Sequence, residues 1–207
     1  MADSEAEGKK LIVDWVNLPE DAKETSLWAS LHDAELKSVR LDRLGRTLDL
    51  EFDVEHLRDF HCFADSTRFL LRFEGVHALR VEISAPWPGE FSVPADTPYA
   101  EAERLRAGYW EKSIQESAPW PEFVKQVEQE QGTTEVYQAT LATGPSGLAL
   151  RLSLNVNYES YPDVSVSAER MSISLSTGED LSLHDFLQLG EFYWNDLAAG
   201  EPSGTIQ

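Results

Sequence analysis

The chain of 207 residues carries 37 acidic against 17 basic residues, which gives a formal net charge of −20 at pH 7. Its 42% hydrophobic and 10% aromatic content is too high for a disordered chain, and its single cysteine excludes an intramolecular disulfide and a cysteine-built zinc site. The sequence lacks the ~18 consecutive apolar residues of a membrane span and the apolar core of a signal peptide. We therefore expect a cytoplasmic protein without a membrane partner. Nucleic acid is not an expected partner either, because phosphate binding needs lysine and arginine.

The chain begins with a polar, acidic segment, residues 1–24, which we predict to be a partly flexible lead. Ser26 then precedes the apolar residues 27–31, a pattern typical of one or two helical turns. From residue 34 onward the period of the hydrophobic pattern changes to two, which indicates strands.

Alternation of apolar and polar residues predicts six or seven antiparallel strands, each with one buried face. The segments are residues 35–42, 47–54, 68–74, 77–84, 135–142, 148–157 and 164–175. The turn before Thr47 contains glycine and predicts a hairpin of the first two strands, with a bulge near Ser38, where the alternation slips. Gly75 predicts a second hairpin, formed by the next two. In the sixth strand, Leu150 and Leu152 should lie on the buried face.

Two helical regions complete the pattern. Thr97 and Pro98 resemble an N-cap and first helical residue, so residues 97–131 predict a helical insertion between the strand groups. Ser182 and Asp185 fit a capping box, and apolar residues at helical spacing predict a helix at the C-terminal end.

These elements predict an α+β fold with an antiparallel, β-rich sheet of six to seven strands, a helical insertion and a C-terminal helix. We expect residues 25–200 to form one β-rich domain. An alternative division has two β halves, residues 25–84 and 133–200, joined by the helical segment. Residues 201–207 are expected to be a tail.

Two Leu-His-Asp tripeptides, residues 31–33 and 183–185, invite comparison with metal phosphohydrolases, in which a His-Asp pair binds the metal. Those enzymes carry the pair on an all-helical bundle, whereas this chain is β-rich and both pairs fall at predicted helix ends. We therefore interpret both pairs as structural. Cys62 follows a histidine, and we interpret it as a small hydrophobic residue. The sequence predicts no catalytic residue, no metal site and no cofactor.

Aromatic and acidic residues are the candidates for partner binding. Rigid aromatic side chains either pack at the edge of a core or anchor an interface, and no lysine or arginine follows Arg170. The predicted partner-binding residues are Trp87, Trp120, Glu179, Asp180, Glu191, Tyr193, Trp194 and Asp196.

The segment Ser26-Leu27-Trp28-Ala29-Ser30-Leu31-His32-Asp33-Ala34-Glu35-Leu36 resembles a bacterial family, as does the later Arg72-Phe73-Glu74-Gly75-Val76. Family members carry a Trp-x-x-(Leu/Phe)-His-Asp-Ala-Glu segment, then a hairpin and an Arg-Phe-x-Gly-Val strand, and some are grouped with polymorphic-toxin immunity proteins. The match covers residues 26–84, with Trp28, His32, Asp33 and Glu35 as the structural motif. The resemblance implies a small, β-rich cytoplasmic protein of bacteria and transfers no catalytic residue.

We expect a non-enzymatic, acidic binding protein, such as an immunity protein or inhibitor that neutralises a basic toxin or another basic protein partner. An acidic surface would steer such a partner and raise the association rate. Two alternatives stay open, a metal-dependent hydrolase that uses His32 and Asp33 and an assembly or adaptor protein.

Overall fold

A computed structural model describes residues 23–84, 97–98, 100–101, 104, 120–128, 133–144, 147–156 and 161–200. In chain order its elements are β1 (Lys23–Ser26), α1 (Trp28–Leu31), β2 (Glu35–Asp42), β3 (Thr47–Asp53), α2 (Glu55–Phe60), β4 (Phe69–Glu74), β5 (Ala78–Ser84), α4 (Trp120–Val127), β6 (Thr134–Gly144), β7 (Gly147–Val156), β8 (Tyr161–Ala168), β9 (Arg170–Leu175), β10 (Asp180–Leu181) and α5 (Leu183–Ala199).

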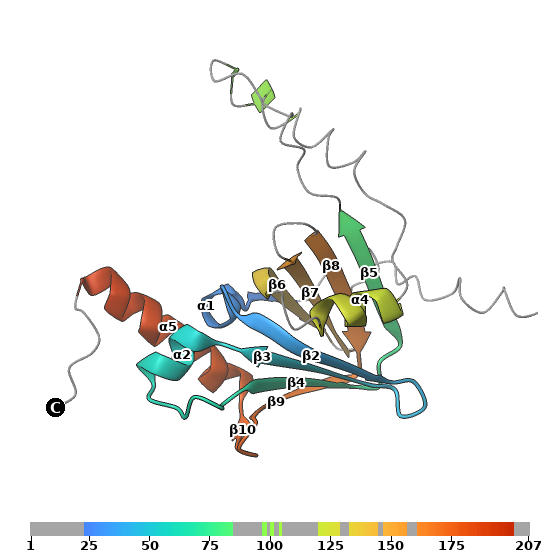
Figure 1. Ribbon diagram of the computed structural model, residues 1–207, viewed down its shortest axis with the longest axis horizontal. Coiled ribbons are helices and arrows are strands. Elements are labelled where there is room, and N and C mark those ends of the chain that lie inside the picture. Colours follow the sequence, from blue (N-terminus) through green and yellow to red (C-terminus); the bar gives the residue numbers. More distant parts are fainter. Residues whose placement is uncertain are drawn as a thin grey trace, which may run out of the picture.

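In these residues ten antiparallel strands form one sheet, and α5 follows it, which confirms the predicted α+β class (Figure 1). The expected number of strands, six or seven, is too low. The predicted strand 164–175 is two strands, since the chain breaks at Glu169. The other two additions, β1 and β10, have four and two residues, too few for an alternating pattern to stand out.

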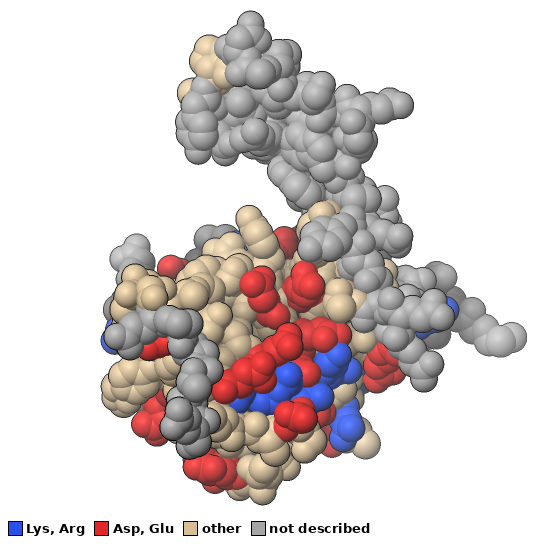
Figure 2. All heavy atoms as spheres, turned by 60° about the vertical axis from the view of Figure 1, so that its left-hand side comes forward, with Lys and Arg blue, Asp and Glu red and all other residues tan. Residues whose placement is uncertain are grey.

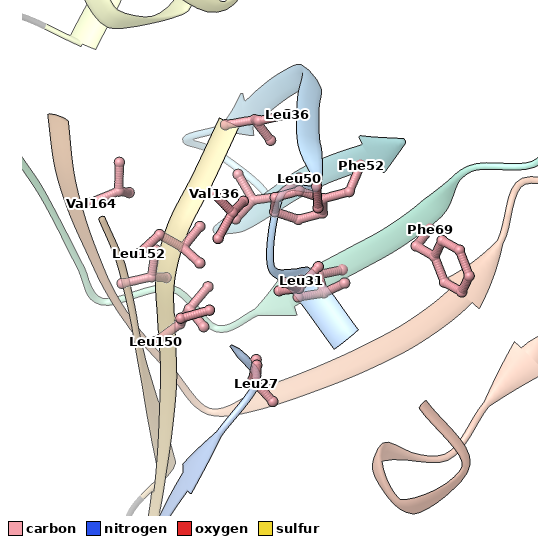
Figure 3. Close-up of a cluster of buried hydrophobic side chains, with 14 of the residues drawn as sticks. Leu27, Leu31, Leu36, Leu50, Phe52, Phe69, Val136, Leu150, Leu152 and Val164 are labelled. Carbon is pink, nitrogen blue, oxygen red and sulfur yellow. The ribbon is translucent and has the colours of Figure 1, made fainter. Parts of the chain in front are cut away.

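The sheet consists of two halves, β10-β9-β4-β3-β2 and β6-β7-β8-β5, with β1 paired to β6. A single residue pair, Glu35 with Glu135, joins β2 to β6. Inward-facing residues of both halves belong to one hydrophobic core, in which Leu50, Leu150 and Leu152 are fully buried (Figure 3). The predicted burial of Leu150 and Leu152 is therefore confirmed.

The predicted hairpin of residues 68–74 with 77–84 is wrong. β4 pairs with β3 and β9, whereas β5 pairs with β8. At Gly75, whose φ is +65°, the chain leaves one half of the sheet for the other, and the returning chain crosses beside it at Glu169. The N–H of Glu169 donates to the carbonyl of Glu74 at 3.0 Å, which joins the two crossings. The alternation of apolar and polar residues correctly predicts which face of each strand is buried. It does not determine which other strand lies next to it in the sheet.

Local signals in the chain predict the other connections well. β2 and β3 form the expected hairpin, and its register shifts between Leu36 and Ser38, as the slipped alternation predicts. Ser182 is the N-cap of α5, and its Oγ accepts a hydrogen bond from the Asp185 N–H at 3.1 Å. α4 agrees with the second part of the predicted insertion, while most of residues 97–119 lie outside the described chain.

No helix in the described residues is both long and apolar enough to cross a membrane.

Candidate functional site

The C-terminal helix α5 packs unusually closely against α1, and Gly190 permits this approach. A Cβ at Gly190 would lie 2.4 Å from the carbonyl carbon and oxygen of Ala29, closer than real Cβ contacts. Two hydrogen bonds join the helices on either side. The Ser30 hydroxyl donates to the Phe186 carbonyl at 2.8 Å, and the Trp194 indole N–H donates to the Ala29 carbonyl at 2.9 Å. Gly190 therefore has a packing role that outweighs its low helix propensity.

The close approach brings together five rings, which we call the aromatic cluster: Trp28, His32, His56, Tyr193 and Trp194. The rings of Trp28 and His32 stack with centroids 4.4 Å apart, and those of Trp28 and Trp194 stack at 4.9 Å. His56 on α2 lies 4.7 Å from Tyr193 and 6.0 Å from Trp194. The cluster thus joins α1, α2 and α5 at one side of the sheet (Figure 1).

His32 and Trp194 lie against the same face of the Trp28 indole. Their own centroids are 5.7 Å apart, whereas rings on opposite faces would be separated by at least about 7 Å, twice the ~3.5 Å contact distance. Trp28 is nevertheless 41% exposed among the described residues. Two rings thus support one face of a tryptophan that is partly exposed.

Histidines of the cluster differ in environment. Burial lowers the pKa of His56 below its usual 6.5, against opposing effects of the Ala29 carbonyl and the Asp33 carboxylate. His56 is therefore neutral at pH 7, and its Nε2 is buried without a hydrogen-bond partner in the described residues. The His32 Nε2 lies 3.4 Å from an Asp33 carboxylate oxygen, and its Nδ1 is buried without a hydrogen-bond partner in the described residues.

Neither His-Asp pair is part of a recognisable metal site. In the described ranges, no group of three or more histidine, cysteine, aspartate or glutamate residues is placed to hold a metal ion. His32 is the C-cap residue of α1, and its backbone N–H donates to the Trp28 carbonyl at 2.8 Å. His184 and Asp185 lie exposed in the first turn of α5. Both pairs lie at helix ends, as predicted.

Four of the predicted partner-binding residues lie together on the C-terminal half of α5, where Tyr193 and Trp194 are half-buried in the aromatic cluster. The other two are Glu191, which is exposed, and Asp196, which is half-buried. Of the four, Trp194 stacks on Trp28, which the sequence indicated only as a structural motif residue.

The other four candidates do not join this group. Glu179 and Asp180 are exposed next to the N-terminal end of α5, so the length of the helix separates them from Trp194. Trp120 begins α4 and packs against Phe123, with centroids 5.5 Å apart. Trp87 lies outside the described residues.

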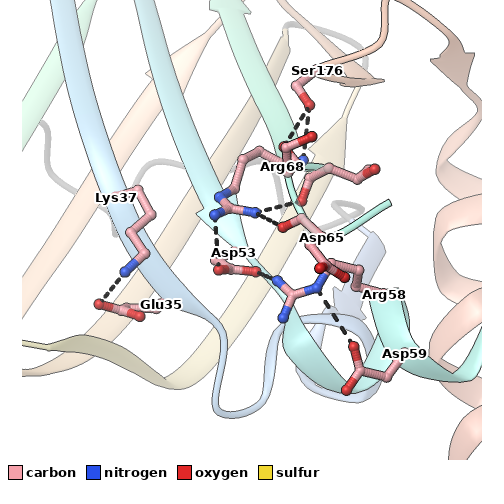
Figure 4. A network of polar contacts seen from close by, with 10 residues as sticks. Glu35, Lys37, Asp53, Arg58, Asp59, Asp65, Arg68 and Ser176 are labelled. Atoms are coloured by element: carbon pink, nitrogen blue, oxygen red, sulfur yellow. Dashed lines mark hydrogen bonds and ion pairs between the residues drawn. The ribbon is translucent and has the colours of Figure 1, made fainter. Parts of the chain in front are cut away.

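Charged side chains on the sheet are mostly paired, unlike those on α5. The Arg72 guanidinium donates two hydrogen bonds of 2.7 Å to Asp49. Arg58 and Arg68 both contact the carboxylate of Asp53 (Figure 4). Figure 4 also shows the fourth motif residue, Glu35, in an ion pair with Lys37 on β2.

No ion pair within the described part of the chain holds Glu191 or Asp196. Glu191 is exposed, whereas Asp196 is half-buried and its Oδ2 is buried. Figure 2 shows one face of the molecule, on which acidic side chains surround a compact group of lysines and arginines. Helix α5 itself carries three acids, Asp185, Glu191 and Asp196, and neither lysine nor arginine.

The sequence did not predict α2 or the position of His56. α2 has only six residues and a single buried one, Leu57, so it lacks a helical hydrophobic period. A nitrogen of the His61 imidazole lies 3.0 Å from the Leu189 carbonyl and links α2 to α5. Cys62, which follows, is exposed with φ +56°, so it is not the buried hydrophobic residue that was expected.

Comparison with known protein families, curated proteins and solved structures finds no match to this chain. The resemblance over residues 26–84 therefore stays a prediction.

Proposed function

We propose that this protein is a non-enzymatic, acidic binding protein that docks on a basic protein partner, in the manner of an immunity protein or inhibitor. The docking surface would consist of Trp28 on α1 and of Glu191 and Trp194 on the adjoining side of α5. The observation that carries this proposal is the 41% exposed Trp28, which stacks on Trp194 one helical turn from Glu191, an exposed acid with no ion pair among the described residues.

Aromatic residues and charges have different roles in such an interface. Large aromatic side chains that are already held in place anchor a complex at little cost in conformational entropy, and their loss raises the dissociation rate. Unpaired charges act over a Debye length of about 8 Å at physiological salt and raise the association rate of an oppositely charged partner. The exposed indole and the neighbouring carboxylates supply both kinds of group.

Affinity capture with matched variants tests the proposal. Full-length protein would be immobilised and incubated with lysate of the source organism at about 0.15 M salt, and the bound proteins identified by mass spectrometry. The site variant combines Trp28→Ala with Glu191→Lys. The control variant combines Phe192→Ala with Glu128→Lys, which removes an exposed ring and reverses an exposed acid outside the surface.

We expect the wild type and the control to retain a basic protein that the site variant loses. The retained protein should elute as salt is raised, because its approach is electrostatic. Equal capture by the wild type and the site variant, or capture of no basic protein by the wild type, would contradict the proposal.

A further inference from the structure

We propose that two copies of this protein associate through the outer edge of strand β5, which pairs antiparallel with β5 of the second copy about a two-fold axis at Val81. The sheets of the two copies would then continue as one sheet across the dimer. This inference does not depend on the proposed function, because the proposed docking surface contains no residue of β5.

Strand β5 is the long and regular edge of the sheet. The strand order ends with β10 on one side and with β5 on the other, and no strand of the described residues pairs with the outer edge of β5 (Figure 1). β10 has two residues, whereas all seven residues of β5 pair with β8 without a register shift. Short length, bulges and prolines commonly block an exposed edge, and β5 has none of them. Its edge is therefore a template to which another strand can add.

The pairing with β8 identifies the backbone groups that point to this edge. The carbonyl of Ser167, which lies opposite Ala78, faces β5, because it accepts a hydrogen bond from the His77 N–H at 3.0 Å. Hydrogen-bonded and non-hydrogen-bonded pairs alternate along an antiparallel ladder, so the even-numbered residues of β5 bond to β8. Pro162, which has no N–H, lies opposite an odd-numbered residue, as this phase requires. The residues whose N–H and C=O groups point to the outer edge are Leu79, Val81 and Ile83.

The charged residues of β5 select one register for a second copy. With the axis at Val81, the odd-numbered residues lie opposite one another, all seven residues pair, and Arg80 of each copy lies opposite Glu82 of the other. An axis one residue earlier would place Arg80 opposite itself, and an axis one residue later would place Glu82 opposite itself. Opposite charges across a strand pair are stabilising and like charges are destabilising. The edge of β5 is thus complementary to itself in one register.

Both faces of the strand pair agree with this register. Arg80 and Glu82 would form non-hydrogen-bonded pairs, in which opposing side chains approach most closely. Their side chains are 44% and 33% exposed and form an ion pair within β5, so the dimer would join two ion pairs into one network of four charges. On the other face, Leu79 is half-buried at the rim of the core and would lose exposed apolar surface on pairing.

The dimer should be weak, because one strand pair buries less surface than a standard protein interface. Each copy also carries a net charge of −20, and the resulting repulsion between copies opposes association. We therefore expect a monomer–dimer equilibrium that depends on protein concentration. Sedimentation velocity of the full-length protein from about 5 μM to about 500 μM measures this equilibrium.

Charge reversals in β5 test the register. Arg80→Glu and Glu82→Arg each place like charges opposite one another in the dimer, so each should weaken dimerisation about tenfold. Arg43→Glu and Glu128→Arg make the same changes of net charge at exposed positions outside β5 and should leave dimerisation within about twofold. The double variant Arg80→Glu with Glu82→Arg exchanges the two charges and should dimerise as the wild type does.

An equal mixture of the two single β5 variants is the sharpest sample. In a mixed dimer the two acidic residues of one copy lie opposite the two basic residues of the other, so the mixture should recover the dimer that each variant alone weakens. Native mass spectrometry should identify the mixed dimer by its mass. The inference would be overturned by a wild type that stays monomeric at about 500 μM or by single variants that dimerise as the wild type does. A mixture or a double variant that stays monomeric would overturn it as well.

Discussion

Replacing Gly190 by alanine should destabilise the protein, although alanine is the better helix former. In a solvent-exposed helix this change would stabilise by about 1 kcal/mol. Here the new methyl group would lie 2.4 Å from the Ala29 carbonyl group and 2.7 Å from the Ser30 nitrogen, all backbone atoms that cannot rotate away. Overpacking of this kind costs about 1–3 kcal/mol. Helix α5 would have to move away from α1 to relieve it.

That movement would also weaken the two hydrogen bonds that join the helices, from Ser30 to Phe186 and from Trp194 to Ala29. Each contributes about 1 kcal/mol net. After the gain in propensity is subtracted, we expect Gly190→Ala to lower the free energy of unfolding by about 2–4 kcal/mol.

Urea denaturation followed by circular dichroism measures this effect, provided that the slope of the transition is unchanged. Asn195→Ala on the exposed flank of the same helix is the matched control and should change stability by less than about 0.5 kcal/mol. A Gly190→Ala protein as stable as the wild type, or more stable, would refute the close approach of the helices.

Three further predictions concern the core, the pH dependence and the charge. Leu152→Ala should cost about 2–5 kcal/mol in a denaturation experiment, and a loss below about 1 kcal/mol would contradict its burial. Because burial lowers the pKa of His56, the neutral imidazole favours the folded state. Its contribution to the free energy of unfolding should be fully present above pH 6.5 and be lost as the pH drops below it. His56→Gln should reduce this loss of stability at low pH, whereas His77→Gln, at an exposed position, should leave it unchanged. Equal pH profiles of the two variants would contradict the attribution to His56. Charge reversal at Glu191 and Asp196 should lower the association rate of a captured partner at low salt, as measured by surface plasmon resonance. An unchanged rate would indicate that both acids contribute only to the solubility of the protein.

Features that depend on neighbouring residues could be predicted from the sequence. The β2–β3 hairpin follows from alternation and a short turn, and the start of α5 follows from Ser182 and Asp185. Pairing between distant segments could not be predicted in the same way. The residues around Gly75 satisfy the pattern of a hairpin, yet the two strands pair with β9 and β8, which lie about ninety residues further along the chain.

The candidate site shows the same division between local and distant information. Tyr193 and Trp194 were identified from their helix and its acidic residues, and both belong to the aromatic cluster. Trp28 was identified only within a motif, because its exposure depends on which of its faces α5 covers. His56 could not be assigned to the cluster, since α2 is too short to show a helical period and contacts α5 from a distant part of the chain.

Gly190 connects the stability of the fold to the proposed binding surface. Its close contact with Ala29 allows the Trp194 indole to reach the Ala29 carbonyl, and Trp194 in turn supports one face of Trp28. Displacing α5 should therefore lower stability and partner affinity together. Trp28→Ala should weaken binding with a much smaller loss of stability, since Trp28 is 41% exposed and makes no side-chain hydrogen bond within the described residues. Measuring unfolding and binding for both variants separates a residue that builds the surface from one that contacts the partner, and parallel losses in Trp28→Ala would show that the ring serves the fold.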